Sequence, residues 1–273
     1  MCGVFRPKFA WSRSFLPWAF SSNMALSCPS CQTLGGGLGG ENFITLLWVI
    51  GITNAINFLD GMDGLAGGTS TINAIFFSLV ALRTGTGDPF MQTMPMLSIA
   101  LAGSCLGFLP YNFRRRQPGL IFLGDSGSKF LGFTLAAIGI LGEWGVDNWV
   151  GLAVPIVILS VPIFDTSLTT VVRIGSGQVR SFGEWLRFTG RDHFHHRISD
   201  LGLGNKRAVL VIYLLSIGQG LEALVLRNAL GFDALFSIVQ VGLAFFLMGA
   251  FMVFVHNRYI KLIEIRRSTP SKA

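Results

Sequence analysis

The sequence predicts an all-α polytopic integral membrane protein, from its composition, its mean hydropathy and a series of long apolar stretches. Of the 273 residues, 51% are hydrophobic and only 13% are charged, whereas charged residues make up about a quarter of an ordinary soluble domain. The mean hydropathy is +0.58. Glycine is abundant at 34 residues, and transmembrane helices tolerate it well. This composition argues against a disordered chain and against a simple soluble enzyme.

The apolar stretches give the number of helices that we expect. A helix crosses a bilayer with about 20 mostly apolar residues. Seven stretches reach or approach that length, at 43–58, 65–82, 90–112, 128–143, 149–172, 208–227 and 233–256. We therefore expect about seven transmembrane helices, which form one multispanning domain over residues 41–256.

The basic residues predict the orientation of the chain. With the loop at 113–127 on the cytoplasmic side, alternation of the spans places three further segments there: 57–66, the long loop 173–207 and the basic tail 257–273. Sixteen of the 21 Lys and Arg then lie on the cytoplasmic side, and only Arg83 and Arg227 lie opposite. The net charge of +7 therefore reflects membrane orientation and predicts no nucleic-acid partner. We expect a multi-pass protein of the inner membrane.

Residues 1–40 differ from the rest of the chain. They combine scattered Trp, Pro, Ser and Cys with a GGGLGG run, and they hold no apolar stretch long enough to span. A signal peptide is one interpretation, but Arg13 and Pro17 interrupt its apolar core. We favour an atypical leader, non-native or disordered. Cys28 and Cys31 form a lone CxxC, which argues against a zinc site.

The first polar cluster lies in NAINFLDGMDGLAGG, residues 54–68. Asn54, Asn57 and Asp60 are spaced by three residues, which aligns them along one side of a helix. Asp60 and Asp63 each precede a glycine, a turn-forming pair that also lets a polar ligand approach the backbone. Acidic residues at membrane depth normally mark function. The alternative is ordinary capping of a helix end.

The second cluster, FLGDSGSK at 122–129, stands directly before an apolar stretch. A Gly/Ser turn that opens a helix is an anion site, because its unpaired N–H groups point outward. Asp125 adds a carboxylate, and Mg²⁺ is typically bound by one or two carboxylates together with substrate phosphates. Taken alone, this segment would be a generic turn.

The third cluster, RDHFHHR at 191–197, contains three of the four histidines. Histidine can ligate a transition metal, but the flanking Arg191 and Arg197 fit recognition of phosphate or sugar hydroxyls better. The alternative is a solvated loop without a ligand. Asp165 is equally consistent with a helix cap and a ligand, and the arginines at 114–116 are interpreted as a membrane anchor. All three clusters are expected at one membrane face.

Together, these segments resemble the polyprenyl-phosphate N-acetylhexosamine-1-phosphate transferases of glycosyltransferase family 4, from about residue 41 to about residue 216. Members of that family transfer a sugar 1-phosphate from a UDP-sugar to a polyprenyl phosphate and release UMP, in the synthesis of cell-envelope glycans. The RDHFHH form looks more like the N-acetylglucosamine branch than the muramoyl-pentapeptide branch. The resemblance implies a UDP-N-acetylhexosamine and a lipid phosphate as partners, and it is compatible with a homodimer.

The resemblance also implies roles for individual residues. It implies a Mg²⁺ cofactor, with Mn²⁺ as an alternative, at Asn57 and Asp125. It assigns catalysis to Asp60, Asp63 and Asp125. It assigns substrate binding to six residues: Asn54, Asn57, Arg191, His193, His195 and His196.

One departure from the family concerns an acidic pair. Members normally carry further transmembrane helices and an Asp-Asp pair before the Asn-rich motif, and this sequence contains no Asp-Asp. We expect a chain that corresponds to the C-terminal two-thirds of such an enzyme. Two alternatives remain: an inactive truncated remnant, and a membrane transporter whose acids line a pathway. The absence of an evident two-fold repeat argues against the transporter.

Overall fold

The computed structural model describes residues 38–83, 89–114, 117–145, 148–175, 204–229 and, except for 238, 248 and 252, 235–254. Within these residues all regular elements are helices, which confirms the all-α class. Their bounds are α2 Leu38–Leu59, α3 Leu65–Leu82, α4 Pro89–Asn112, α5 Gly124–Leu141, α6 Asn148–Ile158, α7 Ser160–Gly175 and α10 Asn205–Leu226. A further apolar helix covers Leu235–Phe251.

Each of the seven apolar stretches coincides with helix in the described part of the chain. Four helices there are long and apolar enough to span a membrane: α2, α3, α4 and α10. A fifth span results if α6 and α7 are counted as one, although they are bent by 77°. Helix α5 falls short because its first turns are the polar Gly-Asp-Ser-Gly-Ser-Lys segment. The protein is therefore a multi-pass membrane protein.

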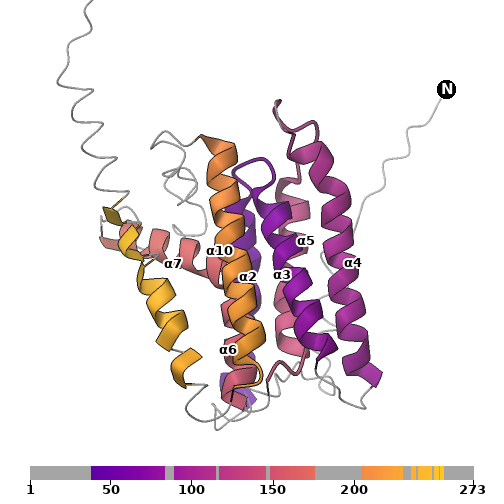
Figure 1. Cartoon of the computed structure of the whole chain (residues 1–273), viewed down its shortest axis with the longest axis vertical. Coiled ribbons are helices and arrows are strands. Elements are labelled where there is room, and N and C mark those ends of the chain that lie inside the picture. The colour runs from indigo at the N-terminus through magenta and orange to yellow at the C-terminus, as the bar shows by residue number, and fades with distance from the viewer. Residues whose placement is uncertain are drawn as a thin grey trace, which may run out of the picture.

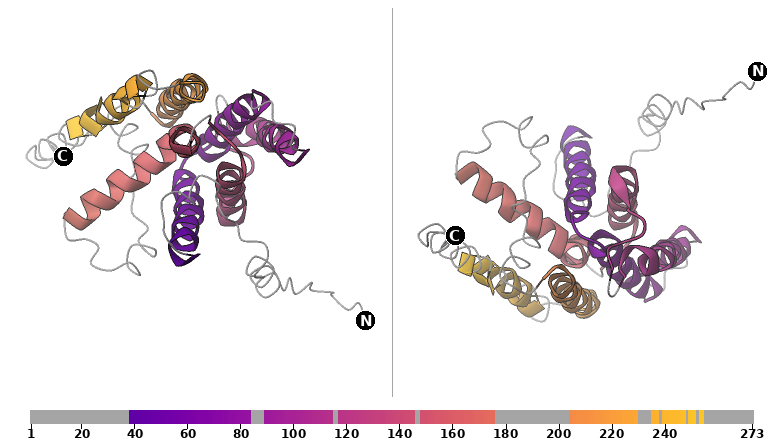
Figure 2. Two further views of the ribbon diagram at one scale, coloured as in Figure 1. Left: turned by 90° about the horizontal axis from the view of Figure 1, so that it is seen from below. Right: turned by 90° about the horizontal axis from the view of Figure 1, so that it is seen from above.

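The helices form an upright bundle with one element lying across it (Figure 1). Helices α2, α3, α4, α5 and α10 run along the long axis, and Figure 2 shows them nearly end-on, with α7 extending outward. The bend between α6 and α7 falls at Leu159. Pro162 has no N–H to donate to the carbonyl of Ile158, which interrupts the helix at that point. The stretch at 149–172 is thus two helices in different directions.

Close packing at glycines holds the bundle together. A Cβ atom on Gly132 of α5 would lie 2.7 Å from Cα of Thr53 in α2, so these two helices meet backbone to backbone. A Cβ atom on Gly220 of α10 would collide with the ring of Phe76 in α3. Small residues at such contacts are a common basis of helix association in membranes. The outward faces stay apolar, as lipid contact requires.

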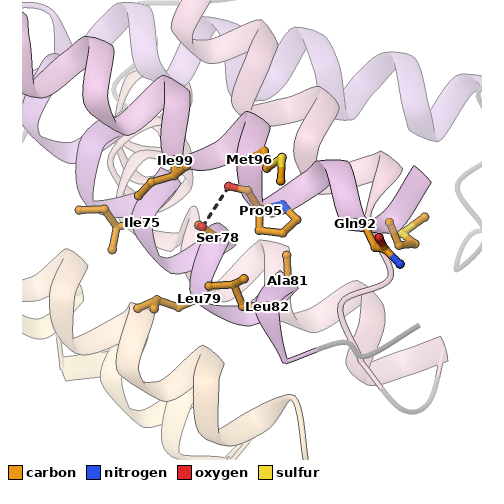
Figure 3. Close-up of a pocket in the computed structure, with 10 residues that line it drawn as sticks. Ile75, Ser78, Leu79, Ala81, Leu82, Gln92, Pro95, Met96 and Ile99 are labelled. Carbon is orange, nitrogen blue, oxygen red and sulfur yellow. Dashed lines mark hydrogen bonds between the residues drawn. The ribbon is translucent and has the colours of Figure 1, made fainter. Parts of the chain in front are cut away.

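A cavity of about 780 Å³ lies between the second half of α3 and the first half of α4 (Figure 3). Oγ of Ser78 donates a hydrogen bond to the carbonyl of Pro95 across 3.0 Å at its wall. No ionisable side chain is among the described lining residues: Ile75, Ser78, Leu79, Ala81, Leu82, Met91, Gln92, Pro95, Met96 and Ile99. The polar clusters lie at the other end of α3.

Candidate active site

The first motif forms the turn between α2 and α3. Helix α2 ends at Leu59, and α3 begins after Gly64, whose φ of +83° is a conformation that side chains rarely adopt. A Cβ atom at Gly64 would also collide with the ring of Phe113. The second Asp-Gly pair of the motif is therefore needed for the turn, and it fixes the backbone next to Asp63.

Asn112, at the end of α4, connects this turn to the loop before α5. Its Oδ1 accepts a hydrogen bond from the N–H of Gly64 at 2.6 Å. Its Nδ2 donates to the carbonyl of Ile121 at 2.9 Å. The N–H of Gly119 in the same loop donates to Oδ2 of Asp63 at 2.8 Å. Sequence reasoning missed Asn112, although a lone amide at the end of an apolar stretch was a visible signal.

Helix α10 supports the same turn from the other side. The hydroxyl of Tyr213 donates a hydrogen bond to the carbonyl of Gly64. The Tyr213 ring lies 6.1 Å, centroid to centroid, from the ring of Phe113. Tyr213 was also missed, because no local pattern marks a tertiary hydrogen bond of this kind. The turn is thus held by residues from both α4 and α10.

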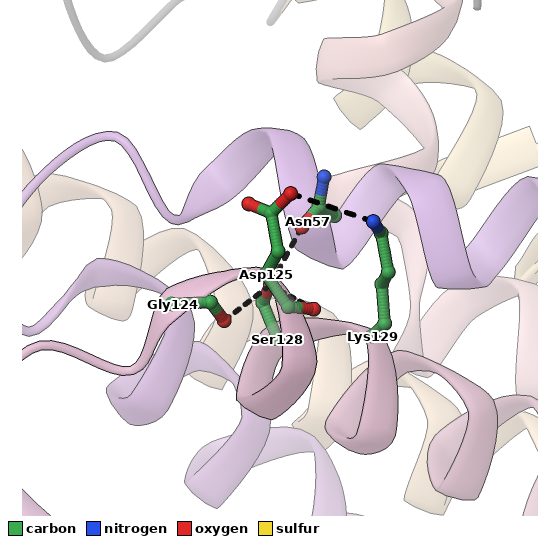
Figure 4. A network of polar contacts seen from close by, with 5 residues as sticks. All are labelled: Asn57, Gly124, Asp125, Ser128 and Lys129. Atoms are coloured by element: carbon green, nitrogen blue, oxygen red, sulfur yellow. Dashed lines mark hydrogen bonds and ion pairs between the residues drawn. The ribbon is translucent and has the colours of Figure 1, made fainter. Parts of the chain in front are cut away.

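The second motif opens α5 and contacts the end of α2 (Figure 4). Oγ of Ser128 donates to Oδ1 of Asn57 across 2.6 Å. Asp125 lies in the first turn of α5, where its Oδ2 is 3.5 Å from Nζ of Lys129. The Asp125 side chain is 84% exposed, so it remains available to a ligand. The structure therefore brings Asn57 and the Asp125 segment together.

Three carboxylates from the two motifs gather at this point. The pKa of the Asp60 carboxyl is raised to about 6, mainly by burial and in addition by the negative charges of Asp125 and Asp63. A hydrogen bond from the N–H of Gly124 acts in the opposite direction. The influence of Asp125 and Asp63 on Asp60 indicates that the three carboxyl groups lie near one another, in one acidic cluster that a cation would stabilise.

Other candidate residues are placed differently. Nδ2 of Asn54 donates to the carbonyl of Ile50 in its own helix at 2.9 Å, so that amide group bonds within α2. Asp165 is buried inside α7, away from its ends, so the helix-cap interpretation is wrong. The third cluster, with Arg191, His193, His195 and His196, lies outside the described residues, as do most of the proposed leader 1–40 and the tail 257–273.

The oxygen atoms of Asp125 and of the neighbouring Asn57 fit Mg²⁺ as ligands. Asp125 offers an exposed carboxylate and Asn57 an amide oxygen, and hard divalent cations prefer oxygen ligands. Among the described residues, no group of three or more His, Cys, Asp and Glu side chains could hold a metal by itself. A site with only Asp125 and Asn57 as protein ligands fits Mg²⁺ better than zinc, because Mg²⁺ commonly completes its coordination shell with water and substrate phosphates.

Comparison with known proteins gives a family match over part of the chain. Residues 13–143 match the model of Glycosyl transferase family 4. The chain is 40% identical over 195 residues to the "Probable undecaprenyl-phosphate N-acetylglucosaminyl 1-phosphate transferase" of Bacillus subtilis, covering 71% of this chain and 51% of the relative. It is 35% identical over 219 residues to the decaprenyl-phosphate N-acetylglucosaminephosphotransferase of Mycobacterium leprae, covering 75% and 50%.

A relative that is named for a different activity matches as well. The chain is 36% identical over 188 residues to the phospho-N-acetylmuramoyl-pentapeptide-transferase of Moorella thermoacetica, covering 67% of this chain and 51% of the relative. The chain thus spans about half the length of the curated relatives that it matches. Over residues 13–143 the chain matches the model of Glycosyl transferase family 4, and the similarity to these relatives extends over 67–75% of this chain.

Proposed function

We propose that this chain transfers N-acetylglucosamine 1-phosphate from its UDP-sugar to a polyprenyl phosphate and releases UMP, in cell-envelope glycan synthesis. The observation that carries the proposal is the single acidic cluster that the two motifs form, connected through Ser128 and Asn57. The relatives named above as N-acetylglucosamine-phosphate transferases support the choice of sugar. The membrane spans suit a lipid acceptor.

The chemistry requires neutralisation of negative charge. A phosphate monoester attacks a diphosphate, so several anionic oxygens converge in the transition state. When bound, Mg²⁺ supplies positive charge to these oxygens. Asp125 and Asn57 would hold the ion, and Lys129, next to Asp125, adds a fixed positive charge. The N–H groups in the first turn of α5 have no partner within the helix and, apart from that of Gly124, which bonds to Asp60, they favour a phosphate at the same place.

Proton transfer falls to the carboxylate with the raised pKa. Asp60 has a pKa of about 6, near the second ionisation of a phosphate ester. The ionised carboxylate of Asp60 is therefore suited to accept a proton from the attacking phosphate.

Asp63, which accepts a hydrogen bond from the N–H of Gly119, is assigned to the nucleotide side of the cluster. The sugar is assigned to Arg191, His193, His195 and His196, with the cluster on the cytoplasmic face of the inner membrane.

Release of UMP by the purified chain tests the proposal. The assay contains UDP-N-acetylglucosamine, polyprenyl phosphate and Mg²⁺, and it compares the chain with Asp125→Asn. Glu143→Gln is the matched control, because it makes the same change just beyond the other end of α5. We expect turnover that Asp125→Asn and chelation of Mg²⁺ abolish and that Glu143→Gln retains.

No turnover by a folded chain would contradict the proposal. Equal turnover by Asp125→Asn would contradict the assignment of that residue. Cross-linking of the chain in membranes tests the proposed homodimer separately.

A further inference from the structure

The end of the bundle opposite the acidic cluster carries two arginines. Arg83 directly follows α3, and Arg227 directly follows α10. These helices lie side by side (Figure 1) and run in the same direction, because Tyr213 contacts Gly64 at one end and Gly220 contacts Phe76 further along. The arginines are about 27 Å from the cluster along α3, given its 18 residues.

The helix register brings the two arginines together. Arg83 follows Phe76 by seven residues, and Arg227 follows Gly220 by seven residues. Seven residues are about two helical turns, so each arginine lies on the face of its helix that already contacts the other. Consistent with this, burial lowers the pKa of the Arg227 guanidinium, and the charge of Arg83 lowers it further.

The guanidinium of Arg227 lacks compensation among the described residues. The residue is only 8% exposed, and its buried Nε has no hydrogen-bond partner. Its one side-chain bond goes from Nη1 to Oδ1 of the neighbouring Asn228, at 3.4 Å. Neither arginine forms an ion pair with a described carboxylate. The dipole at a helix C-terminus accounts for the position of each arginine taken separately. It does not account for two like charges placed next to each other, one of which has an unsatisfied Nε–H.

We propose that Arg83 and Arg227 bind the phosphate of an anionic phospholipid at the membrane surface opposite the active site. Both residues directly follow helices that are long and apolar enough to span a membrane, and lipid headgroups lie where such a span ends. Guanidinium groups match phosphate in charge and in hydrogen-bond geometry. Basic pockets between transmembrane helices commonly recognise such headgroups.

The apolar cavity indicates a lipid as the source of the phosphate. Ile75 and Leu79 line that cavity, and Arg83 is the next residue in the same i, i+4 row of α3. The cavity of about 780 Å³ therefore lies along the part of α3 that leads up to Arg83, and Leu82, the residue before it, is in the lining (Figure 3). A phospholipid could place its phosphate on the arginines and an acyl chain along this wall. Free phosphate has no apolar part that could contact the lining of the cavity.

Lipid binding by the full chain tests the inference, whether or not the chain shows turnover. The chain is placed in nanodiscs of phosphatidylcholine with or without phosphatidylglycerol, and retained lipid is measured by native mass spectrometry alongside the melting temperature. We expect preferential retention of phosphatidylglycerol and a higher melting temperature in its presence. The double variant Arg83→Gln/Arg227→Gln should weaken retention about tenfold, as loss of charge-assisted hydrogen bonds predicts.

Two controls keep the result specific. Arg114→Gln/Arg207→Gln removes the same charge at the other end of the bundle and should keep the preference. Because Arg227 is buried, Arg83→Gln alone, which alters an exposed side chain, is measured in parallel and should show a smaller loss of the same sign.

Three outcomes would overturn the inference. The double variant could keep its preference for phosphatidylglycerol. Inorganic phosphate could raise the melting temperature equally in phosphatidylcholine alone, which would make a lipid unnecessary. Finally, Asp88→Asn/Asp233→Asn could lower the melting temperature while the unaltered chain shows no lipid preference. That would assign neutralisation of the arginines to these loop carboxylates, which lie outside the described residues.

Discussion

Oγ of Ser128 donates a hydrogen bond of 2.6 Å to Oδ1 of Asn57, although the two residues are 71 positions apart. This bond connects the end of α2 to the start of α5, so each motif helps to fix the other. Ser128 is fully buried, while Asp125, one turn earlier in α5, is exposed. The arrangement combines a rigid connection with a carboxylate that is open to ligands, as a preorganised site requires.

Removal of the Ser128 hydroxyl should therefore affect both stability and cation binding. In Ser128→Ala, the partly buried amide of Asn57 loses its partner, which should cost about 1–2 kcal/mol and lower the melting temperature by a few degrees. Affinity for Mg²⁺ should also fall. Ser126→Ala, at an exposed position in the same turn, is the control for thermal unfolding and titration. Identical behaviour of the two variants would contradict the role of Ser128.

Asn112 should show a graded series of effects, because it makes one bond as acceptor and one as donor. Asn112→Ala leaves the N–H of Gly64 and the carbonyl of Ile121 unpaired, at a cost of about 2–4 kcal/mol for the two. Asn112→Asp keeps the acceptor for Gly64 and should lose less. Denaturant unfolding in detergent measures both variants. Equal losses would mean that the bond to Gly64 contributes nothing.

Substitution of two glycines with positive φ distinguishes the cost of backbone strain from the cost of a collision between side chains. Gly124→Ala, at φ +67° with nothing within 4 Å, should cost only about 1–2 kcal/mol of conformational strain. Gly64→Ala, at φ +83°, meets the same strain and also the ring of Phe113. We expect a clearly larger loss of melting temperature for Gly64→Ala. A similar loss in both variants would show that Phe113 moves aside freely.

These residues also show what the sequence could predict. The apolar stretches predicted a helix at each position, because spanning length and hydropathy are local properties. The 77° break near Leu159 was missed, although Pro162 was a visible signal, since a hydropathy window does not register a missing N–H. Asp60 and Asp125 were found because acids within apolar surroundings are costly, and Asn57 was found through its spacing of three residues from Asp60. Asn112 and Tyr213 were missed, because their bonds depend on how distant helices pack.

Asp60 gives a prediction for the dependence of stability on pH. Its pKa rises from 3.8 to about 6 on folding, so the folded chain binds more protons than the unfolded chain between these values. Stability of the unaltered chain therefore falls as the pH rises through this window. Without divalent cations, Asp60→Asn should raise the melting temperature near pH 8 by about 2–4 °C, which allows for the partial exposure of Asp60.

The gain from Asp60→Asn should shrink toward about pH 5, where the native carboxyl takes up a proton. Thermal unfolding of both proteins across this pH range in a chelating buffer measures the difference. A gain of the same size at both ends of the range would contradict the assigned pKa. Asp125→Asn, which removes one of the neighbouring charges, should give a smaller gain of the same sign.

Binding of Mn²⁺, followed by electron paramagnetic resonance, tests most directly whether the two motifs form one cation site. Mn²⁺ reports on a Mg²⁺ site built from oxygen donors, and the measurement does not require turnover. The account predicts saturable binding that Asp125→Asn abolishes, that Asn57→Leu weakens and that Glu143→Gln leaves unchanged. Equal binding by Asp125→Asn and the unaltered chain would contradict the central claim.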